Sequence, residues 1–289
     1  MIKTLAITAP TSWIGLALTQ EALNQGYRVL GLGRRDPLLR HSDFTYVPYN
    51  LKQEHAPKIL GSADALIHLA AVMGKGTPDS ATIPQEVRSA CALRQALPAS
   101  APMIFVSSAA AANASSGYRY AVAKAQIEDA LLATMLPVVN VRPGLVYGPG
   151  TPSAFGMLCR VVAKLPILPD FLPRSYIQYI HIQELIVALL KLLTIKAPYP
   201  KAPVFLANPT PISLKELLQK IAHVRYHKHS LFVPIPRAAV LAFLKLLGSG
   251  MYQPLDSLLH AHCVDSRIWW DDLVGSAAIP FIEGLSQNA

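Results

Sequence analysis

The sequence predicts an α/β protein with a doubly wound parallel sheet and a smaller C-terminal lobe. In the first half of the 289-residue chain, short apolar runs of strand length alternate with amphipathic runs of helix length, and hydrophobic residues make up 52% of the whole. Alternating strands and helices favour a parallel sheet with helices on both faces, and this composition can bury a large core. Beyond residue 151 prolines interrupt the chain repeatedly. We therefore expect one domain over 1–150 and a second lobe over 151–289, with segments of the lobe returning to the first domain.

Charge and cysteine content narrow the class of protein. The net charge of +9 favours anionic ligands, while lysines and arginines scattered without a basic, aromatic-rich block argue against nucleic acid as a partner. Cys91, Cys159 and Cys263 lie far apart and predict neither a zinc site nor a disulfide framework. The longest apolar runs carry lysines and are shorter than the about 20 residues of a membrane span. With no secretory leader at the start, we expect a cytoplasmic protein without a transmembrane segment.

The first strand is expected over residues 2–8, followed by a turn over 9–15 and a helix over 16–24 that ends at Gly26. Such a strand, turn and helix suit a dinucleotide, because backbone N–H groups and the helix N-terminus face the pyrophosphate. Of the glycines usual in that turn, only Gly15 is present, where helix and strand pack closely.

The second strand, Arg28 to Leu32, ends in Gly33-Arg34-Arg35. An acidic residue at this position binds a ribose 2′-hydroxyl, whereas two guanidiniums can bind a 2′-phosphate. The pair therefore favours NADP(H) over NAD(H), which remains an alternative, as does a solvated basic turn with no ligand.

Two further strands are expected at residues 44–47 and 65–71. Asn50 and Leu51 follow the first of these, where an adenine can rest. The small residues at the end of the second allow a cofactor to approach closely. His68 lies inside this apolar run and is predicted to be a hydrogen-bonded core histidine. A helix over 85–96 comes next.

The candidate catalytic residues lie near the centre of the chain. The apolar strand Met103 to Val106 stops at Ser107-Ser108, and Tyr120 and Lys124 stand one helical turn apart on the helix that follows. A nearby ammonium favours the phenolate, so Tyr120 is a candidate general acid or base. Because sites in open α/β sheets lie at the carboxyl ends of strands, the serine and this pair can converge on one carbonyl. For the Tyr and Lys pair alone, an exposed helix face is the alternative.

A strand over 137–141 follows, and then a Gly- and Pro-rich loop over 142–150 that is expected to cover the nicotinamide end of the site. In the C-terminal half, Ser213 and Glu216 form a capping box that predicts a helix start. His223, His227 and His229 cluster beyond it, but no carboxylate or cysteine accompanies them, so a metal is not expected.

Taken together, these residues resemble the extended short-chain dehydrogenase/reductase superfamily, specifically the NAD(P)-dependent epimerase/dehydratase family of nucleotide-sugar enzymes. The likeness runs over nearly the whole chain. Its motifs, in order, are Thr8 to Gly15, Arg34, His68-Leu69-Ala70-Ala71, Ser107-Ser108, Tyr120-x-x-x-Lys124, Arg142-Pro143 with Tyr147-Gly148-Pro149-Gly150, Tyr179-Ile180-His181-Ile182, Ser213-Leu214-Lys215-Glu216-Leu217, and Ile279-Pro280 with Glu283-Gly284-Leu285.

The resemblance implies a Rossmann sheet, an NAD(P) cofactor, and a catalytic group of Ser108, Tyr120 and Lys124. A homodimer through paired helices is the assembly it suggests. Substrate contacts are expected from Ser108, Arg174 and His181, and no metal is expected. Cofactor contacts are expected from strand ends and the turns after them: Thr8, Ala9, Thr11, Ser12, Trp13, Ile14, Gly15, Arg34, Arg35, Asn50, Leu51, Leu69, Ala70, Ala71, Val106, Tyr120, Lys124, Pro143 and Val146.

The sequence also departs from the family pattern. Ala9 and Ser12 stand where the first two glycines of the turn belong, Ala112-Asn113 replaces a Tyr-Gly pair, and Ile177 replaces a basic residue for which Arg174 can substitute. Related 4,6-dehydratases carry an Asp-Glu pair directly after the catalytic hydroxyl, and this chain has Ala109-Ala110.

These departures make dehydration the least expected reaction. We expect the reduction of a keto group, with a nucleotide sugar as the substrate class. The alternatives are a nucleotide-sugar epimerase with a retained cofactor and a non-catalytic NADP-binding relative.

Overall fold

The protein is described by a computed structural model that covers residues 2–53, 55–71, 82–116, 118–246 and 252–286. The chain divides into two compact units. Unit 1 comprises Met1–Arg142 and Ile186–Val204, and unit 2 comprises Pro143–Leu185 and Phe205–Ala289. The expected functional division at residue 150, into a cofactor domain and a substrate lobe, stays a prediction.

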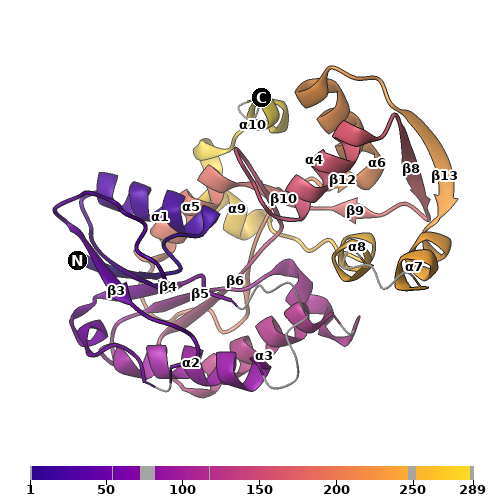
Figure 1. Cartoon of the computed structure of the whole chain (residues 1–289). Coiled ribbons are helices and arrows are strands. Elements are labelled where there is room, and N and C mark those ends of the chain that lie inside the picture. Colours follow the sequence, from indigo (N-terminus) through magenta and orange to yellow (C-terminus); the bar gives the residue numbers. More distant parts are fainter. Residues whose placement is uncertain (1, 54, 72–81, 117, 247–251, 287–289) are drawn as a thin grey trace. The chain divides into compact units, whose positions relative to one another are not determined.

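A seven-stranded sheet of order β11-β6-β5-β4-β1-β2-β3 forms the centre of unit 1. The strands from β3 to β6 pair in parallel. In Figure 1, α2 and α3 cover one face of the sheet and α1 and α5 the other. The elements are β1 (Thr4–Thr8), α1 (Trp13–Asn24), β2 (Arg28–Gly33), β3 (Phe44–Pro48), the 3₁₀ helix η1 (Lys58–Ser62), β4 (Ala65–His68), α2 (Thr82–Ala96), β5 (Met103–Val106), the 3₁₀ segment η2 (Ala109–Ser116), α3 (Arg119–Ala133), β6 (Val138–Pro143), α5 (Ile182–Leu192) and β11 (Val204–Leu206).

This arrangement confirms the predicted doubly wound parallel sheet. Because successive strands run outward from β1 in one direction and then from β4 in the other, the strand order reverses between β1 and β4. Ligands of such sheets bind beyond the carboxyl ends of the strands at this reversal. The predicted dinucleotide turn follows β1, and the predicted Ser108 follows β5, the neighbour of β4.

Several predicted boundaries are wrong, among them the start of the helix predicted over 85–96, which begins at Thr82, and three of them have a clear local reason. The helix predicted from Leu16 begins at Trp13, because the Ser12 side chain caps it by accepting the Gly15 N–H. The strand predicted to continue to Ala71 ends at His68, since the next two N–H groups donate to the Thr8 hydroxyl instead of to a neighbouring strand.

The third boundary concerns residues 142–150, which were predicted to be a loop. They contain the short strand β7 (Leu145–Tyr147), which pairs in parallel with β10 (Tyr179–His181). Glycines and prolines flank the strand, and so the composition of the segment concealed it.

A buried ion pair ties α3 to the end of β6. Glu128 is almost fully buried, and both of its carboxylate oxygens accept hydrogen bonds from the Arg142 guanidinium, the shortest at 2.6 Å. A bidentate pair of this kind fixes orientation as well as distance. The pair thereby fixes the position of α3, which carries Tyr120 and Lys124, relative to β6.

Unit 2 has its own core, which is formed by apolar residues of its helices and short sheets. Ser213 caps α6 by accepting the Glu216 N–H at 3.2 Å, as predicted. The remaining elements of unit 2 are α4 (Ala154–Lys164), β8 (Ile167–Leu172), β9 (Tyr176–Ile177), β12 (Ile212–Ser213), α6 (Leu214–Lys220), the π-helical turn η3 (Ile221–Arg225), β13 (Leu231–Pro236), α7 (Arg237–Leu246), α8 (Tyr252–Leu259), α9 (Arg267–Leu273), η4 (Gly275–Ala277) and α10 (Phe281–Ser286).

Within the residues that the structure describes, no helix combines the length and the apolar character that crossing a bilayer requires.

Candidate active site

The structure brings Ser108 and Tyr120 into direct contact. Ser108 lies two residues beyond the end of β5, and Tyr120 is the second residue of α3. Their side chains are hydrogen-bonded to each other. The Ser108 hydroxyl also accepts the Ala110 N–H at 3.2 Å, which fixes the serine at the strand end. Two hydroxyls therefore meet at the carboxyl end of the sheet, as predicted from their positions in the sequence.

Lys124 lies behind this pair and is buried, with only 2% of its surface exposed. Its Nζ donates a hydrogen bond of 2.8 Å to the Val106 carbonyl oxygen and lies 4.6 Å from the centre of the Phe105 ring. The centre of the Tyr120 ring is 5.8 Å from the same nitrogen. Burial lowers the pKa of Lys124 to about 8, although the carboxylates of Glu86 and Glu128 act in the opposite direction. The lysine therefore sits close to its titration point at neutral pH.

The pKa of Tyr120 moves opposite to the predicted direction. Burial raises the pKa of the phenol above its ordinary value, Tyr118 and Glu86 raise it further, and only the hydrogen bond from Ser108 lowers it. The predicted lowering by Lys124 is wrong, because loss of hydration dominates the shift and Lys124 is not among the groups that contribute to it. Tyr120 thus holds its proton throughout the neutral range.

His68 is a hydrogen-bonded core histidine, as predicted. It is 1% exposed, its Nδ1 lies 2.9 Å from the Thr8 hydroxyl oxygen, and burial lowers its pKa to about 3. That hydroxyl already accepts the N–H groups of Leu69 and Ala70, at 2.9 and 3.0 Å. Both of its lone pairs are then engaged, so the Thr8 O–H donates to Nδ1 and the ring proton of His68 resides on Nε2. Thr8 thereby ties the end of β1 to the end of β4.

The turn after β1 has the shape that a glycine turn normally provides. Ala9 adopts a left-handed conformation with φ of 55°, which costs a residue with a Cβ roughly 1–2 kcal/mol. The Ser12 hydroxyl donates to the Ala9 carbonyl at 2.8 Å and accepts the Gly15 N–H at 3.0 Å. A Cβ on Gly15 would lie 2.1 Å from the Ala9 carbonyl oxygen, so only glycine fits there. Ser12 therefore occupies a helix N–H that a pyrophosphate would otherwise take.

Beyond β2 and β3, the expected adenosine-binding residues lie at the sheet edge. Arg34 and Arg35 are exposed directly after β2. The Asn50 side chain accepts the Lys52 N–H at 3.1 Å, and the Leu51 carbonyl accepts a hydrogen bond from Gln85.

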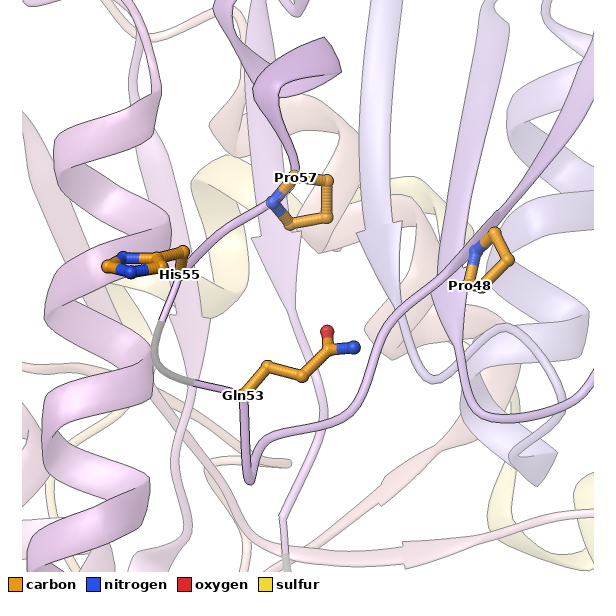
Figure 2. Close-up of a pocket in the computed structure, with 4 residues that line it drawn as sticks. All are labelled: Pro48, Gln53, His55 and Pro57. Carbon is orange, nitrogen blue, oxygen red and sulfur yellow. The ribbon is translucent and has the colours of Figure 1, made fainter.

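An open hollow lies in the same segment of chain and is lined by Pro48, Gln53, His55 and Pro57. Figure 2 shows the Gln53 side chain extending into the space between the two prolines. The hollow has no cluster of reactive groups, and we assign it no role.

The other expected cofactor residues have varied surroundings. Thr11 is exposed, while Trp13 and Ile14 are partly buried in the first turn of α1. Pro143 and Val146 belong to unit 2, on β6 and β7. Leu69, Ala70 and Ala71 are all partly buried beyond β4. Contact between any of these residues and a cofactor stays a prediction.

The two further residues expected at the substrate, Arg174 and His181, both belong to unit 2 and differ sharply in exposure. Arg174 is exposed on the segment after β8. His181 is fully buried, its backbone N–H donates to Glu184 at 2.7 Å, and its ring packs edge-on against Tyr147 at 5.1 Å between centroids. Burial lowers its pKa to about 4. A substrate role for either residue stays a prediction.

The histidine cluster shows one ring contact, between His223 and His229 at 5.7 Å. Across the described ranges, no three His, Cys, Asp or Glu side chains gather closely enough to hold a metal ion.

Sequence reasoning missed the two acids that face Lys124. Glu86 of α2 and Glu128 of α3 are both buried, and each favours the charged form of the lysine. A signal for Glu128 was present, since it follows Lys124 by four residues and so shares its helix face. Glu86 comes from another helix, and no local pattern predicts its contribution.

The sheet with its reversal of strand order and the helix-capped turn after β1 define a protein of the Rossmann type. The chain belongs to the NAD dependent epimerase/dehydratase family, whose model matches residues 6–199. It is 30% identical over 183 residues to the ceramide reductase of Caulobacter vibrioides. That match covers 62% of this chain and spans 57% of the length of the reductase.

Solved structures share the whole fold at low identity. The UDP-glucuronic acid 4-epimerase of Bacillus cereus, bound to UDP-glucuronic acid and NAD, superposes with a TM-score of 0.73 at 17% identity, covering 99% of this chain and 97% of that one. TunA, an NAD-dependent NDP-hexosamine 5,6-dehydratase of tunicamycin biosynthesis, has a TM-score of 0.71 at 16% identity, with 99% and 96% covered. Family and fold are thereby established.

The first prediction concerns the turn. Ala9→Gly should raise the free energy of unfolding by about 1 kcal/mol, because glycine adopts the left-handed conformation without strain. Ser12→Gly should tighten dinucleotide binding, since it frees the Gly15 N–H, at a cost of a few tenths of a kcal/mol in helix capping. Thermal unfolding and fluorescence titration with NADH and NADPH measure the two effects.

Met135→Gly is the matched control for this prediction, since Met135 also has a left-handed φ of 56° and is 84% exposed. It should stabilise the protein without changing cofactor affinity. Weaker dinucleotide binding in Ser12→Gly would show that the serine contacts the cofactor rather than competing with it.

Proposed function

We propose that the protein is a carbonyl reductase that uses NADP(H) and the group Ser108, Tyr120 and Lys124. The observation that carries the proposal is the hydrogen bond between the side chains of Ser108 and Tyr120, with the buried Lys124 behind them. Two O–H groups and one amine or ammonium at the carboxyl end of a parallel sheet are suited to a carbonyl oxygen that gains a proton.

Each residue has a separate task. Tyr120, whose pKa is raised by burial, is protonated at neutral pH and donates its proton to the carbonyl oxygen. Ser108 donates a hydrogen bond to the same oxygen as charge develops on it. Lys124 supplies a cation behind the phenolate that forms, anchored through the Val106 carbonyl. Reduction needs a proton donor at this oxygen, and the protonated phenol of Tyr120 is placed to be that donor.

The residues around the turn fit a dinucleotide. The helix N-terminus of α1, the close packing at Gly15 and the exposed pair Arg34 and Arg35 suit a pyrophosphate and a 2′-phosphate, respectively. When bound, the nicotinamide would supply the hydride for carbon. We therefore propose NADP(H) in preference to NAD(H), within a family whose description names NAD.

Dehydration and epimerisation have less support. The two residues after Ser108 are alanines, and neither can act as the additional acid or base that elimination of water requires. Epimerisation needs a cofactor that stays bound through both hydride transfers, and the Ser12 cap competes for part of its pyrophosphate site.

For the substrate, we propose a ketone of a lipid, with a keto group of a nucleotide sugar as the second candidate. The similarity to a ceramide reductase supports the lipid. Structural neighbours that bind UDP-glucuronic acid and UDP-glucose support the nucleotide sugar. One observation counts against a nucleotide sugar: where the family often has a basic residue, this chain has Ile177, which is buried. Arg174 is the exposed alternative for a diphosphate contact.

The second prediction tests the catalytic group. Tyr120→Phe should reduce turnover by about 10²–10⁴-fold while NADPH affinity changes little. Ser108→Ala should reduce it by about 10²–10³-fold, the usual effect of one lost donor to a developing oxyanion. Lys124→Met should impair both turnover and binding. Oxidation of NADPH with a keto-ceramide in detergent and with a UDP-4-keto sugar measures these effects and identifies the substrate class.

Tyr118→Phe is the matched control, because the ring of Tyr118 lies 5.7 Å from that of Tyr120. It should retain near-normal activity. Full turnover in Tyr120→Phe, on whichever ketone the unmodified protein reduces, would refute the assigned acid.

The third prediction concerns cofactor choice. NADPH should bind at least about tenfold more tightly than NADH, a difference of about 1.4 kcal/mol that charge-assisted contacts readily supply. The double variant Arg34→Ala, Arg35→Ala should lose this preference and keep its affinity for NADH. Arg88→Ala, which removes a cation from α2, serves as the charge control. Equal affinities of the unmodified protein for the two cofactors would contradict the assignment.

A further inference from the structure

Unit 2 exposes an apolar sheet face. Strands β8 and β13 lie side by side in parallel, and Ile167 is the cross-strand partner of Leu231 (Figure 1). These two side chains are 53% and 71% exposed, and Val233, two residues along β13, is 46% exposed. Because side chains alternate between faces, all three belong to one face, together with the partly buried Pro169 and Ile235 and the buried Phe171. Every residue on this exposed part of the face is apolar.

The opposite face of the same sheet is covered at Leu168 and Asp170, while Leu172, Pro234 and Pro236 at its far end are exposed. Leu168 is buried, and Asp170 accepts a hydrogen bond of 2.7 Å from Lys215 of α6. Asp170 and Leu168 alternate with the exposed residues along β8, so α6 packs against the other side. The apolar face is therefore exposed at the start of the two strands, around Ile167 and Leu231, and joins the unit 2 core further along, at Phe171.

Helix α7 follows β13 directly and has exposed apolar side chains of its own. Apart from Arg237 and Lys245, all of its residues are apolar. Leu241 is buried, and its neighbours pack against the unit 2 core. Phe243 and Leu246 are nonetheless 63% and 89% exposed. With the exposed Ala239 and Ala242 they occupy positions i, i+3, i+4 and i+7, so the helix has a second, outward apolar stripe.

The exposed charged residues of the two segments that form this surface are basic. Within 164–174 and 228–246 the sole acid is Asp170, which is buried and paired with Lys215. Lys164 and Lys228 are exposed three residues ahead of Ile167 and Leu231. The basic residues of these two segments are Lys164, Arg174, Lys228, Arg237 and Lys245.

We propose that this apolar surface, formed by the outer face of β8 and β13 and the outward stripe of α7, binds the surface of an anionic lipid bilayer. Exposed apolar side chains gathered on one strand face and on one stripe of the next helix mark an interaction site. An apolar face with basic residues around it fits the acyl boundary and the negative headgroups of a membrane, on which the protein would lie without crossing it.

A second copy of the chain fits this surface less well. A two-fold contact through one patch places the same residues of both copies opposite each other. The cations of one copy would then face those of the other with no exposed acid in these segments to compensate them, which opposes association. The proposal is independent of the catalytic assignment. If the substrate is a lipid, binding to a bilayer would bring the protein to its substrate.

Vesicle flotation tests the proposal with the unmodified full-length protein. It should bind vesicles of phosphatidylcholine mixed with phosphatidylglycerol, bind vesicles of phosphatidylcholine alone much less, and release with added salt. Phe243→Ser, Leu246→Ser should lower partitioning at least tenfold. Lys164→Gln, Lys245→Gln should lower it by about fivefold for each charge removed.

Matched controls distinguish vesicle binding through this surface from non-specific binding by exposed apolar or basic side chains elsewhere. Met135→Ser, Ile268→Ser removes two side chains that are 84% and 74% exposed elsewhere, and Lys196→Gln, Lys201→Gln removes two other exposed lysines. Both double variants should bind vesicles like the unmodified protein. Circular dichroism and thermal unfolding confirm that every variant is folded.

Two results would overturn the proposal. One is an absence of vesicle binding, or equal binding by Phe243→Ser, Leu246→Ser. The other is a dimer, seen by analytical ultracentrifugation, that dissociates in the same variant while vesicles bind neither protein, which would make the surface a self-contact.

Discussion

The burial of Lys124 is the constraint on which the candidate site depends. An amine placed out of contact with water loses its hydration, and here the loss lowers its pKa to about 8. The structure offsets part of that cost with the Val106 carbonyl at 2.8 Å and with two buried acids, Glu86 and Glu128. These partners come from β5, α2 and α3. A single side chain therefore fixes the end of the strand that presents Ser108 relative to the two helices beside it.

The same burial sets the state of its neighbours. Tyr120 keeps its proton because the phenol, too, has lost its hydration, and the hydrogen bond from Ser108 only partly offsets this. His68 stays neutral because it is buried and because a charge on it would face the charge on Lys124. In this resting site the phenol of Tyr120 carries the proton that the proposed reduction of a carbonyl consumes, and the imidazole of His68 is neutral.

The sheet and the meeting of Ser108 with Tyr120 could be predicted from the sequence because both follow from local patterns. Apolar runs define β1, β4 and β5, and the four-residue spacing of Tyr120 and Lys124 puts them on one helix face. What it missed depends on residues distant in the chain. The pKa direction of Tyr120 follows from its burial and from Glu86 of another helix. The strand β7 was missed because its partner β10 lies more than thirty residues away. The apolar surface of unit 2 was missed because the sequence does not show which side of a strand stays uncovered.

The most direct test of the account is the pKa of Lys124, measured by NMR titration of the lysine side-chain resonances, with Lys124→Met used for assignment. The buried ammonium described above should titrate near pH 8, well below the surface lysines, and removal of one facing acid in Glu86→Gln should lower that value further. Titration of Lys124 together with the surface lysines near the ordinary value of about 10.4 would contradict it, since a lysine that keeps its hydration cannot be the buried anchor of this site.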